Sequence, residues 1–343
     1  MPSGSSGPDP RDPSDPAQSD LRDLTVLTET LFFFEHRVRE SSAALLFPPE
    51  GDVVLTSATE DFTFEPGRDY IVEMAPARVV RPRGSRIPAT DRNDLAALAD
   101  GAEDALHRRQ VAATYRHRAK QWSEYAPPLL FDPPPRTRGL LEHGKPLVIG
   151  VAGDSISEGY NASGFVGAAP FQLPYAPLVA SALEREYGSS IALHNCAVAG
   201  WTSDHAVHDV DRLVAPNPDL VIVAFGMNDA GYAEPAHYAA NIAAIRSDVQ
   251  RTVPKAEFLL VSPMLPNPDW DYPVLARFAA YRDALAQMSG SGTALADLTT
   301  VWTRMLRRKS WFDLAGNGFN HPNDFGHRLY ARFILAALGS SRV

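Results

Sequence analysis

Two short apolar runs in the second half of the chain constrain its fold most strongly. Residues Leu147 to Val151 and Leu220 to Ala224 have the length and β-branched content of buried strands. Strands buried on both faces are typical of parallel sheets, because helices cover both sides of such sheets. Each run is followed by a polar turn that contains glycine. The sequence therefore predicts an α/β domain with functional side chains at the carboxyl edge of its sheet.

The alternation of strands and helices continues along the second half of the sequence. Strands are expected at 147–152, 190–195, 219–224, 256–262 and 293–297. Helices are expected at about 171–187, 203–213, 235–251, 273–288 and 324–338. Alternation of this kind predicts a parallel sheet between two layers of helices, and we assign this domain to residues 146–343.

Ser155 lies in the turn after the first apolar run, within Gly153-Asp154-Ser155-Ile156-Ser157-Glu158-Gly159. Gly153 permits a tight exit from the strand, which would leave the Ser155 hydroxyl at the sheet edge. A serine hydroxyl is a weak nucleophile unless a base and an oxyanion site accompany it. Candidates follow in chain order: Gly200 after the second strand, Asn228 in Gly226-Met227-Asn228-Asp229, and His321 in His321-Pro322-Asn323-Asp324.

Each of these segments also has a purely structural interpretation. A Gly-Asp-Ser sequence occurs in surface turns, Asn228 could cap the next helix, and Asn323 could be the N-cap of the helix expected at 324–338. Three of the four segments nevertheless follow predicted parallel strands, so they would meet at one edge of one sheet.

Together, the Gly-Asp-Ser turn, the lone Gly200, the Gly-x-Asn-Asp turn and the late His-Pro-Asn resemble the four blocks of the SGNH hydrolases, also called GDSL hydrolases. The resemblance covers roughly residues 146–340. It implies a flavodoxin-like three-layer fold, with Ser155 as nucleophile and His321 as general base. It also implies an oxyanion hole made by the N–H groups of Ser155 and Gly200 and by the Asn228 amide. No metal or organic cofactor is needed for this chemistry.

The third member of the triad departs from the family pattern. SGNH hydrolases usually place an aspartate three residues before the histidine, and this chain has Gly318 there. If one residue has been inserted, Asn317 falls at the expected place with an amide instead of a carboxylate. Asp313 and Asp324 are the nearest acids, and a backbone carbonyl could also accept the imidazole N–H. We expect Asp313 to be the partner of His321, with the other three groups as alternatives.

Aromatic and amide side chains near the four blocks are candidates for substrate contact. Trp201, Tyr160 and Asn161 are expected to line the mouth of the site, although Trp201 could equally belong to the core. The loop at 263–273 carries Trp270 and Tyr272 among polar residues. Such a loop suits stacking on sugar rings, or it may only cover the core.

The first half of the chain predicts a smaller β domain. Strands are expected at 52–56, 62–64, 70–74, 78–80 and 110–117. We interpret residues 21–122 as a small antiparallel β-sandwich, residues 123–145 as a proline-rich connector, and residues 1–20 as a disordered tail. Two-domain SGNH esterases with an N-terminal β-sandwich are a known pattern, and carbohydrate esterases are prominent among them.

Composition narrows the partners and the location. The net charge of −9 argues against nucleic acid and anionic membranes as main partners. Cys196 is the sole cysteine, so the chain has neither an internal disulfide nor a cysteine-rich zinc site. No apolar stretch reaches the 18 residues of a membrane span, and Met1 to Asp20 lacks the apolar region of a signal peptide. We therefore expect a cytoplasmic protein.

The function expected from these features is ester hydrolysis through an acyl-enzyme. The most specific expectation is deacetylation of a carbohydrate or a glycosylated small molecule, with a preference for short acyl chains because no long apolar loop surrounds the blocks. One alternative is an acyltransferase or thioesterase that uses the same serine and histidine. A second alternative is a non-catalytic binding protein on a hydrolase scaffold, and the intact Ser155, Gly200, Asn228 and His321 count against it.

Overall fold

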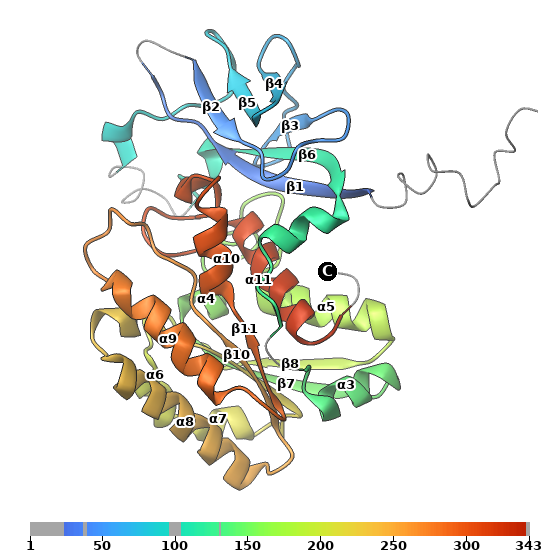
Figure 1. Ribbon diagram of the computed structural model, residues 1–343, viewed down its shortest axis with the longest axis vertical. Coiled ribbons are helices and arrows are strands. Elements are labelled where there is room, and N and C mark those ends of the chain that lie inside the picture. The colour runs from blue at the N-terminus through green and yellow to red at the C-terminus, as the bar shows by residue number, and fades with distance from the viewer. Residues whose placement is uncertain (1–23, 37–39, 96–103, 130–131, 341–343) are drawn as a thin grey trace, which may run out of the picture.

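The computed structural model describes residues 24–36, 40–95, 104–129 and 132–340 (Figure 1). The tail expected at 1–20 lies outside the described residues. The described chain forms two antiparallel sheets from its first part and one parallel sheet with helices from its second part. This arrangement confirms the predicted fold class.

The parallel sheet contains five strands, and all five were predicted. They are β7 (Leu147–Gly153), β8 (Ile191–Asn195), β9 (Leu220–Ala224), β10 (Glu257–Val261) and β11 (Thr293–Ala296). Their order across the sheet is β11-β10-β9-β7-β8, which is the 2-1-3-4-5 order of flavodoxin-like folds. The strand order reverses between β7 and β9, and open sheets of this type bind ligands at the carboxyl ends of the strands at this point.

Helices cover both faces of the parallel sheet (Figure 1). One layer holds α3 (Pro135–Glu142), α5 (Tyr175–Tyr187) and α11 (Asp324–Ala337). The opposite layer holds α6 (Ser203–Val207), α7 (Val210–Val214), α8 (Pro235–Thr252) and α9 (Leu275–Met288). The helix predicted at 203–213 is therefore two short helices. The short α4 (Ser155–Glu158) follows β7, and α10 (Leu298–Met305), which was not predicted, follows β11.

The first part of the chain forms two three-stranded antiparallel sheets. One has the order β1 (Leu24–Phe32), β6 (Gln110–Arg118), β3 (Val54–Ser57), and the other has the order β2 (Ser41–Ala44), β5 (Ala77–Arg81), β4 (Ile71–Met74). The prediction missed β1 and β2. Five 3₁₀ helices complete the described elements: η1 (Arg92–Asp94), η2 (His107–Arg109), η3 (Ala119–Glu124), η4 (Asp229–Gly231) and η5 (Trp311–Asp313).

The proline-rich connector contains a helix that the sequence analysis did not predict. Pro135 is the first residue of α3, where its missing N–H costs no hydrogen bond. The next two N–H groups, of Arg136 and Thr137, donate to the Glu257 carboxylate at 2.9 and 2.6 Å. A distant carboxylate thus caps the helix, so the prolines start a helix here and do not prevent one.

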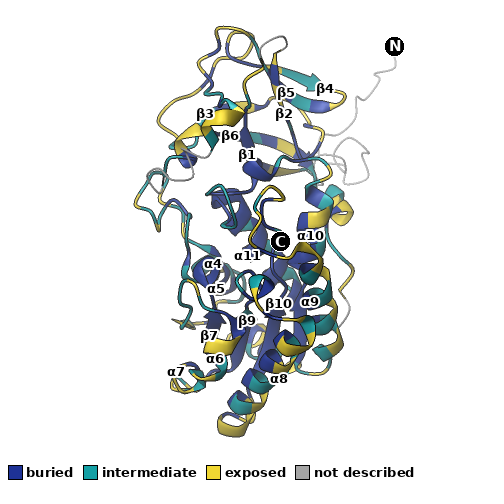
Figure 2. Ribbon diagram, turned by 90° about the vertical axis from the view of Figure 1, so that its left-hand side faces the viewer, coloured by how far each residue is buried: buried dark blue, intermediate teal, exposed yellow. Residues whose placement is uncertain are grey.

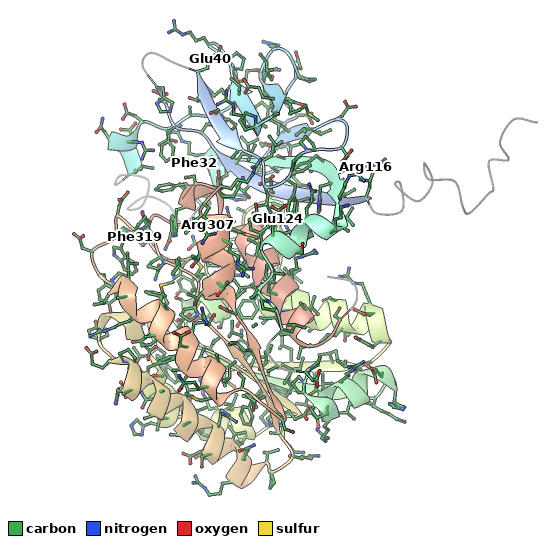
Figure 3. All side chains as sticks on the ribbon, viewed as in Figure 1. Phe32, Glu40, Arg116, Glu124, Arg307 and Phe319 are labelled. Atoms are coloured by element: carbon green, nitrogen blue, oxygen red, sulfur yellow. The ribbon has the colours of Figure 1, made fainter. Side chains whose placement is uncertain are left out.

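A buried group of charges joins the antiparallel sheets to the α/β part. The Lys309 ammonium, just after α10, lies 2.6 Å from a Glu29 carboxylate oxygen on β1 and 3.5 Å from an Asp313 carboxylate oxygen. All three side chains are at most 1% exposed. We call Glu29, Lys309 and Asp313 the interdomain charge cluster. Figure 3 shows Phe32, at the end of β1, close to this junction.

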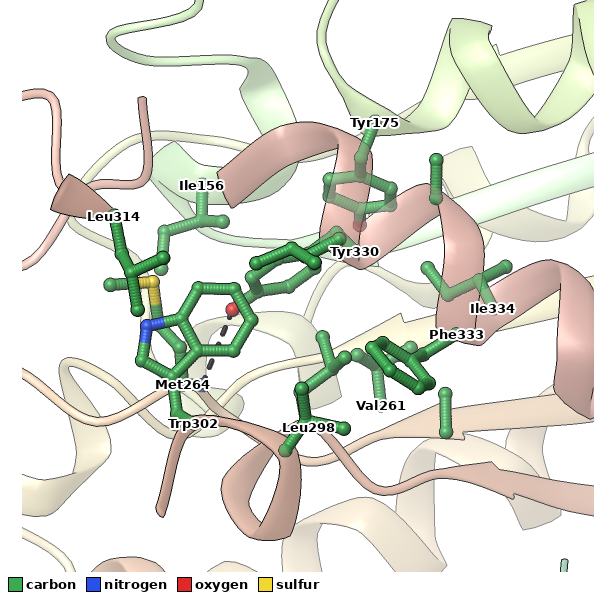
Figure 4. Packing of buried hydrophobic residues seen from close by; sticks show 14 of the residues in the cluster. Ile156, Tyr175, Val261, Met264, Leu298, Trp302, Leu314, Tyr330, Phe333 and Ile334 are labelled. Atoms are coloured by element: carbon green, nitrogen blue, oxygen red, sulfur yellow. Dashed lines mark hydrogen bonds between the residues drawn. The ribbon is translucent and has the colours of Figure 1, made fainter. Parts of the chain in front are cut away.

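The core of the α/β part lies between the sheet and its helices, where strand residues are buried (Figure 2). Within this core, Trp302 of α10 packs edge-to-face on Tyr330 of α11, with ring centroids 5.4 Å apart (Figure 4). The Met264 N–H donates to the Tyr330 hydroxyl at 3.3 Å. These contacts hold α11 in place. The loop that directly precedes this helix carries His321.

Candidate active site

Ser155 is the first residue of α4, directly after the tight turn that ends β7. A Cβ on Gly153 would lie 2.2 Å from the Ser157 hydroxyl oxygen and 3.0 Å from the Ala224 carbonyl oxygen, so only glycine fits there. Asp154 caps α4 by accepting the Ile156 N–H at 3.0 Å. The sequence therefore places Ser155 at the carboxyl end of β7, as predicted.

His321 meets the Ser155 hydroxyl from the other side of the site. The distance between Ser155 Oγ and His321 Nε2 is 2.8 Å, although the two residues are 166 positions apart. Burial and, to a smaller extent, the neighbouring His327 lower the pKa of His321 to about 4. The imidazole is therefore neutral at neutral pH, which is the state that can accept the serine proton.

Two side-chain amides face the other nitrogen of His321. Asn161 Oδ1 lies 2.8 Å from His321 Nδ1, and Asn317 Nδ2 lies 3.0 Å from the same atom. Asn161 was predicted to line the mouth of the site, and the structure places its side-chain oxygen on the imidazole.

The prediction that Asp313 orients His321 is wrong. One Asp313 oxygen accepts the Phe32 N–H at 2.7 Å, and the other accepts the Ser310 N–H at 2.9 Å beside Lys309. Asp313 thus belongs to the interdomain charge cluster. The alternative acid, Asp324, accepts the Ser163 N–H at 2.7 Å. Both carboxylates accept hydrogen bonds from backbone N–H groups. The spacing of residues along the chain could not reveal these contacts.

The segment that carries Gly200 is tied to both sides of the Ser155 turn. The Val198 N–H donates to the Gly153 carbonyl at 3.1 Å, and the Ala199 N–H donates to the Glu158 carboxylate at 2.7 Å. Gly200 itself is exposed and has a φ of +78°, in the left-handed region that favours glycine. The loop after β8 is thus held beside the nucleophile.

Asn228, in the turn after β9, is bonded to the same loop. Its side-chain Nδ2 donates to the Trp201 carbonyl at 2.9 Å, one residue beyond Gly200. The neighbouring Asp229 is fully buried and accepts the Ser203 N–H at 2.9 Å. Burial raises the pKa of Asp229. These bonds join the two turns that the sequence analysis assigned to oxyanion binding, and they leave the second hydrogen of the Asn228 amide for another acceptor.

His327 supports the site and was not singled out from the sequence. This side chain is fully buried on α11. Its Nδ1 accepts the Tyr175 N–H at 3.3 Å, so its Nε2 carries the hydrogen that bonds the Tyr160 carbonyl at 3.1 Å. His327 therefore holds the backbone just before Asn161. The only signal for this role was a histidine in the apolar stripe of a predicted helix.

The remaining predicted substrate residues have different surroundings. The Tyr160 ring lies 5.2 Å from the His321 ring and 4.8 Å from the partly exposed Phe165 ring, so it borders the site. The Trp201 ring stacks on His205 at 5.7 Å, and the Arg212 guanidinium lies 5.4 Å from its centroid. Tyr160 is thus beside His321, while the Trp201 ring packs on α6 and α7.

Four aromatic rings form a connected row between the His321 loop and the loop after β9. The ring centroids are 5.7 Å apart for Phe319 and Trp270, 5.1 Å for Trp270 and Tyr272, and 5.7 Å for Tyr272 and Tyr232. Tyr232 is 73% exposed and Tyr272 is 38% exposed. We call these four residues the aromatic ledge. Figure 3 labels Phe319, which begins the row two positions before His321.

A hydrogen-bonded asparagine anchors the ledge to the loop that carries His321. The Asn267 N–H donates to the Phe319 carbonyl, and its side-chain Nδ2 donates to the Gly318 carbonyl, both at 2.8 Å. The loop at 263–273 is therefore fixed against the segment that carries His321.

Within the described ranges, no group of three or more His, Cys, Asp or Glu side chains is placed to hold a metal ion. In the same part of the chain, no helix has both the length and the apolar character that crossing a bilayer requires.

Comparisons with known proteins find one matching family and several similar solved structures. The model of the GDSL-like lipase/acylhydrolase family matches residues 151–329, which is more than half of the chain. No curated protein sequence matches. Among solved structures, a two-domain esterase active on acetylated mannans is 21% identical, with a TM-score of 0.47, over 60% of this chain and 50% of that one.

A second solved structure, a catalytic mutant of an acetylxylan esterase from Geobacillus stearothermophilus, is 20% identical to the chain, with a TM-score of 0.47. That match covers 58% of this chain and 96% of the other. The chain thus spans about half of the mannan-active esterase and nearly all of the xylan-active one. At these identities the likeness concerns the fold alone.

Proposed function

The chain belongs to the GDSL-like lipase/acylhydrolase family, and from that premise we propose that it is a serine ester hydrolase that removes acetyl groups from a carbohydrate or a glycosylated small molecule. One observation carries the proposal: the Ser155 hydroxyl lies 2.8 Å from Nε2 of His321, a half-buried histidine whose lowered pKa keeps it neutral at neutral pH. A hydroxyl and a base at this distance form an activated nucleophile.

In the first half of the reaction, His321 Nε2 takes the Ser155 proton while Oγ attacks the ester carbonyl carbon. The carbonyl π electrons move onto oxygen, and a tetrahedral oxyanion forms. The N–H groups of Ser155 and Gly200 and the Asn228 amide are the proposed donors to this oxyanion. Each such donor lowers the barrier by about 3–4 kcal/mol in serine hydrolases. Collapse of the intermediate then breaks the ester C–O bond, and the imidazolium protonates the departing alkoxide.

In the second half, water replaces the alcohol. His321 Nε2 takes a proton from water, and the hydroxide oxygen attacks the acyl carbon bonded to Ser155. The second tetrahedral intermediate releases the carboxylic acid, and the imidazolium returns its proton to Ser155 Oγ. No group outside the chain, the ester and water enters this balance.

The aromatic ledge supports a carbohydrate as the leaving alcohol. Sugar rings have apolar C–H faces between hydroxyl groups, and exposed aromatic rings can stack on these faces while the hydroxyls stay hydrated. Tyr232 and Tyr272 are exposed, and the ledge reaches the catalytic loop at Phe319. Such a row beside the loop that carries His321 suits a chain of sugar units better than it suits a single acyl tail.

The test is hydrolysis of p-nitrophenyl esters from acetate to octanoate and of acetylated oligosaccharides by the wild-type chain and by Ser155→Ala. Ser123→Ala, which changes an exposed serine on η3, is the matched control. We expect Ser155→Ala to abolish turnover, the control to keep it, and acetate to be the fastest ester. Activity of Ser155→Ala above a few per cent of wild type would refute the nucleophile. Faster turnover of octanoate would refute the preference for short acyl groups.

A further inference from the structure

We propose that Asn161 is the third member of the triad, a positioning residue that holds His321 in the tautomer with hydrogen on Nδ1. The triad is then Ser155-His321-Asn161, with a neutral amide where most serine hydrolases have a carboxylate. This inference rests on the proposed function, because it assigns the residue that prepares His321 to act as base.

The orientation of the Asn161 amide follows from its second contact. Its Nδ2 donates to the Gly316 carbonyl at 3.2 Å, so its Oδ1 is the atom that faces His321 Nδ1 at 2.8 Å. Asn161 and Gly316 pack closely against each other, because a Cβ on Gly316 would lie 2.4 Å from the Asn161 Cβ. Asn161 also has a φ of +63°, a conformation that asparagine and glycine tolerate better than most residues.

The orientation of the Asn317 amide is fixed in the opposite sense. Its Oδ1 accepts three backbone N–H groups, those of Phe319, Asn320 and His321, at 3.0, 2.9 and 3.0 Å. Exchange of its oxygen and nitrogen would lose all three bonds. A donor, Asn317 Nδ2, therefore faces His321 Nδ1 at 3.0 Å.

The two asparagines thus favour different tautomers of the same histidine. With hydrogen on Nδ1, the ring donates to Asn161 and leaves the Nε2 lone pair free to accept the Ser155 proton. With hydrogen on Nε2, the ring accepts from Asn317 and cannot act as base toward Ser155. Only the first state is catalytic, and Asn161 supplies the acceptor that stabilises it.

The surroundings of His321 contain other titratable groups. Tyr160 lies against the ring from the loop after α4, Asp154 lies before the nucleophile, and His327 and Asp324 lie on α11. Burial and His327 lower the pKa of His321. Both partners of Nδ1 are amides, so no charge on this side of the ring offsets burial.

The test uses three variants of the full chain. Asn161→Gly removes the acceptor and keeps a residue that tolerates the positive φ. We expect kcat to fall by about 100-fold or more with KM changed less than about threefold, because loss of the correct tautomer costs about 10⁴ in a serine protease. Asn317→Asp keeps an oxygen for the three N–H groups and places a second oxygen opposite Nδ1. The double variant Asn161→Gly/Asn317→Asp should have a kcat at least about tenfold higher than that of Asn161→Gly, because its carboxylate accepts the Nδ1 hydrogen.

Asn320→Asp is the control, since it adds the same charge one residue from His321 at a side chain whose oxygen meets Asn317 Nδ2. It should not rescue Asn161→Gly. An unchanged kcat in Asn161→Gly, or equal rescue by both aspartates, would overturn the proposal.

A spectroscopic readout separates this inference from the proposed function. The ¹⁵N shifts of the His321 imidazole, assigned by their loss in His321→Gln, report which nitrogen carries hydrogen whether or not the protein hydrolyses esters. We expect hydrogen on Nδ1 in the wild type and a shift toward Nε2 in Asn161→Gly. Hydrogen on Nε2 in the wild type would refute the role of Asn161, whereas full activity of Ser155→Ala would refute the proposed function and leave the assignment of the His321 tautomer standing.

Discussion

Amide partners on His321 have a direct consequence for the pH dependence of activity. A carboxylate partner would raise the pKa of the imidazole, but here burial dominates and lowers that pKa from 6.5 to about 4. His321 is a base only when it is neutral. We therefore expect kcat/KM for p-nitrophenyl acetate to be constant down through pH 6 and to fall as the pH drops through about 4. An acidic limb centred near 6.5, the value of free histidine, would contradict this expectation.

The residues of the site differ in how far the sequence could identify them. Ser155 and His321 lie in motifs, and the structure brings them together. The role of Asn161 could not be predicted, because its contact with His321 joins residues 160 positions apart. Asp313 was chosen for its charge and its nearness in the chain. The spacing of residues along the chain does not show that β1 approaches Asp313 and donates a backbone hydrogen bond to its carboxylate.

At the scale of elements, the proposed function assigns binding of a sugar chain to the aromatic ledge and ester hydrolysis to Ser155 and His321. Trp270 contacts both Phe319 and Tyr272, so it is one of the two inner rings of the row. We expect Trp270→Ala to raise KM for acetylated oligosaccharides by about tenfold, because a stacked aromatic contributes about 1 kcal/mol or more. Hydrolysis of p-nitrophenyl acetate, which is too small to span the ledge, should change little.

Phe62→Ala is the matched control for this measurement, since Phe62 is a partly exposed aromatic residue near β3. It should leave the hydrolysis of acetylated oligosaccharides and of p-nitrophenyl acetate unchanged. An equal loss on both substrates in Trp270→Ala would show that Trp270 supports the catalytic loop and does not bind sugar.

The elements themselves were predictable where apolar periodicity is strong. All five parallel strands were predicted, and the clearest signals were apolar runs such as Leu220 to Ala224, whose residues are mostly buried. The prediction failed where a distant group decides the structure. Helix α3 begins among prolines because Glu257 accepts its first free N–H groups. Strand β1 mixes polar and apolar residues over most of its length, and it pairs with β6 along all of that length.

At the scale of the whole molecule, the interdomain charge cluster makes the two parts depend on each other. Lys309→Met would leave the Glu29 carboxylate buried without its cation, and removal of one partner of a buried pair costs about 3–5 kcal/mol. We expect a loss of this size in the free energy of unfolding, measured by urea denaturation. The double variant Glu29→Leu/Lys309→Met should recover much of the loss.

Exposed ion pairs provide the comparison for this result. Arg138→Met breaks a pair with Glu142 on the surface of α3, and such pairs contribute about 0–1 kcal/mol. If Lys309→Met were no more destabilising than Arg138→Met, the cluster would not hold the two parts together.

The position of Lys309 also affects how the protein can be made. Its ammonium bonds the Thr30 carbonyl of β1 across 279 positions of sequence. Ribosomes add about 5–20 residues per second, so β1 is synthesised roughly 14–56 s before the cation that Glu29 requires. During that interval a buried Glu29 would have no counter-charge, so its carboxylate is more stable when it stays hydrated. The antiparallel sheets, although translated first, therefore reach their final packing on the α/β part only after residue 309 has left the ribosome.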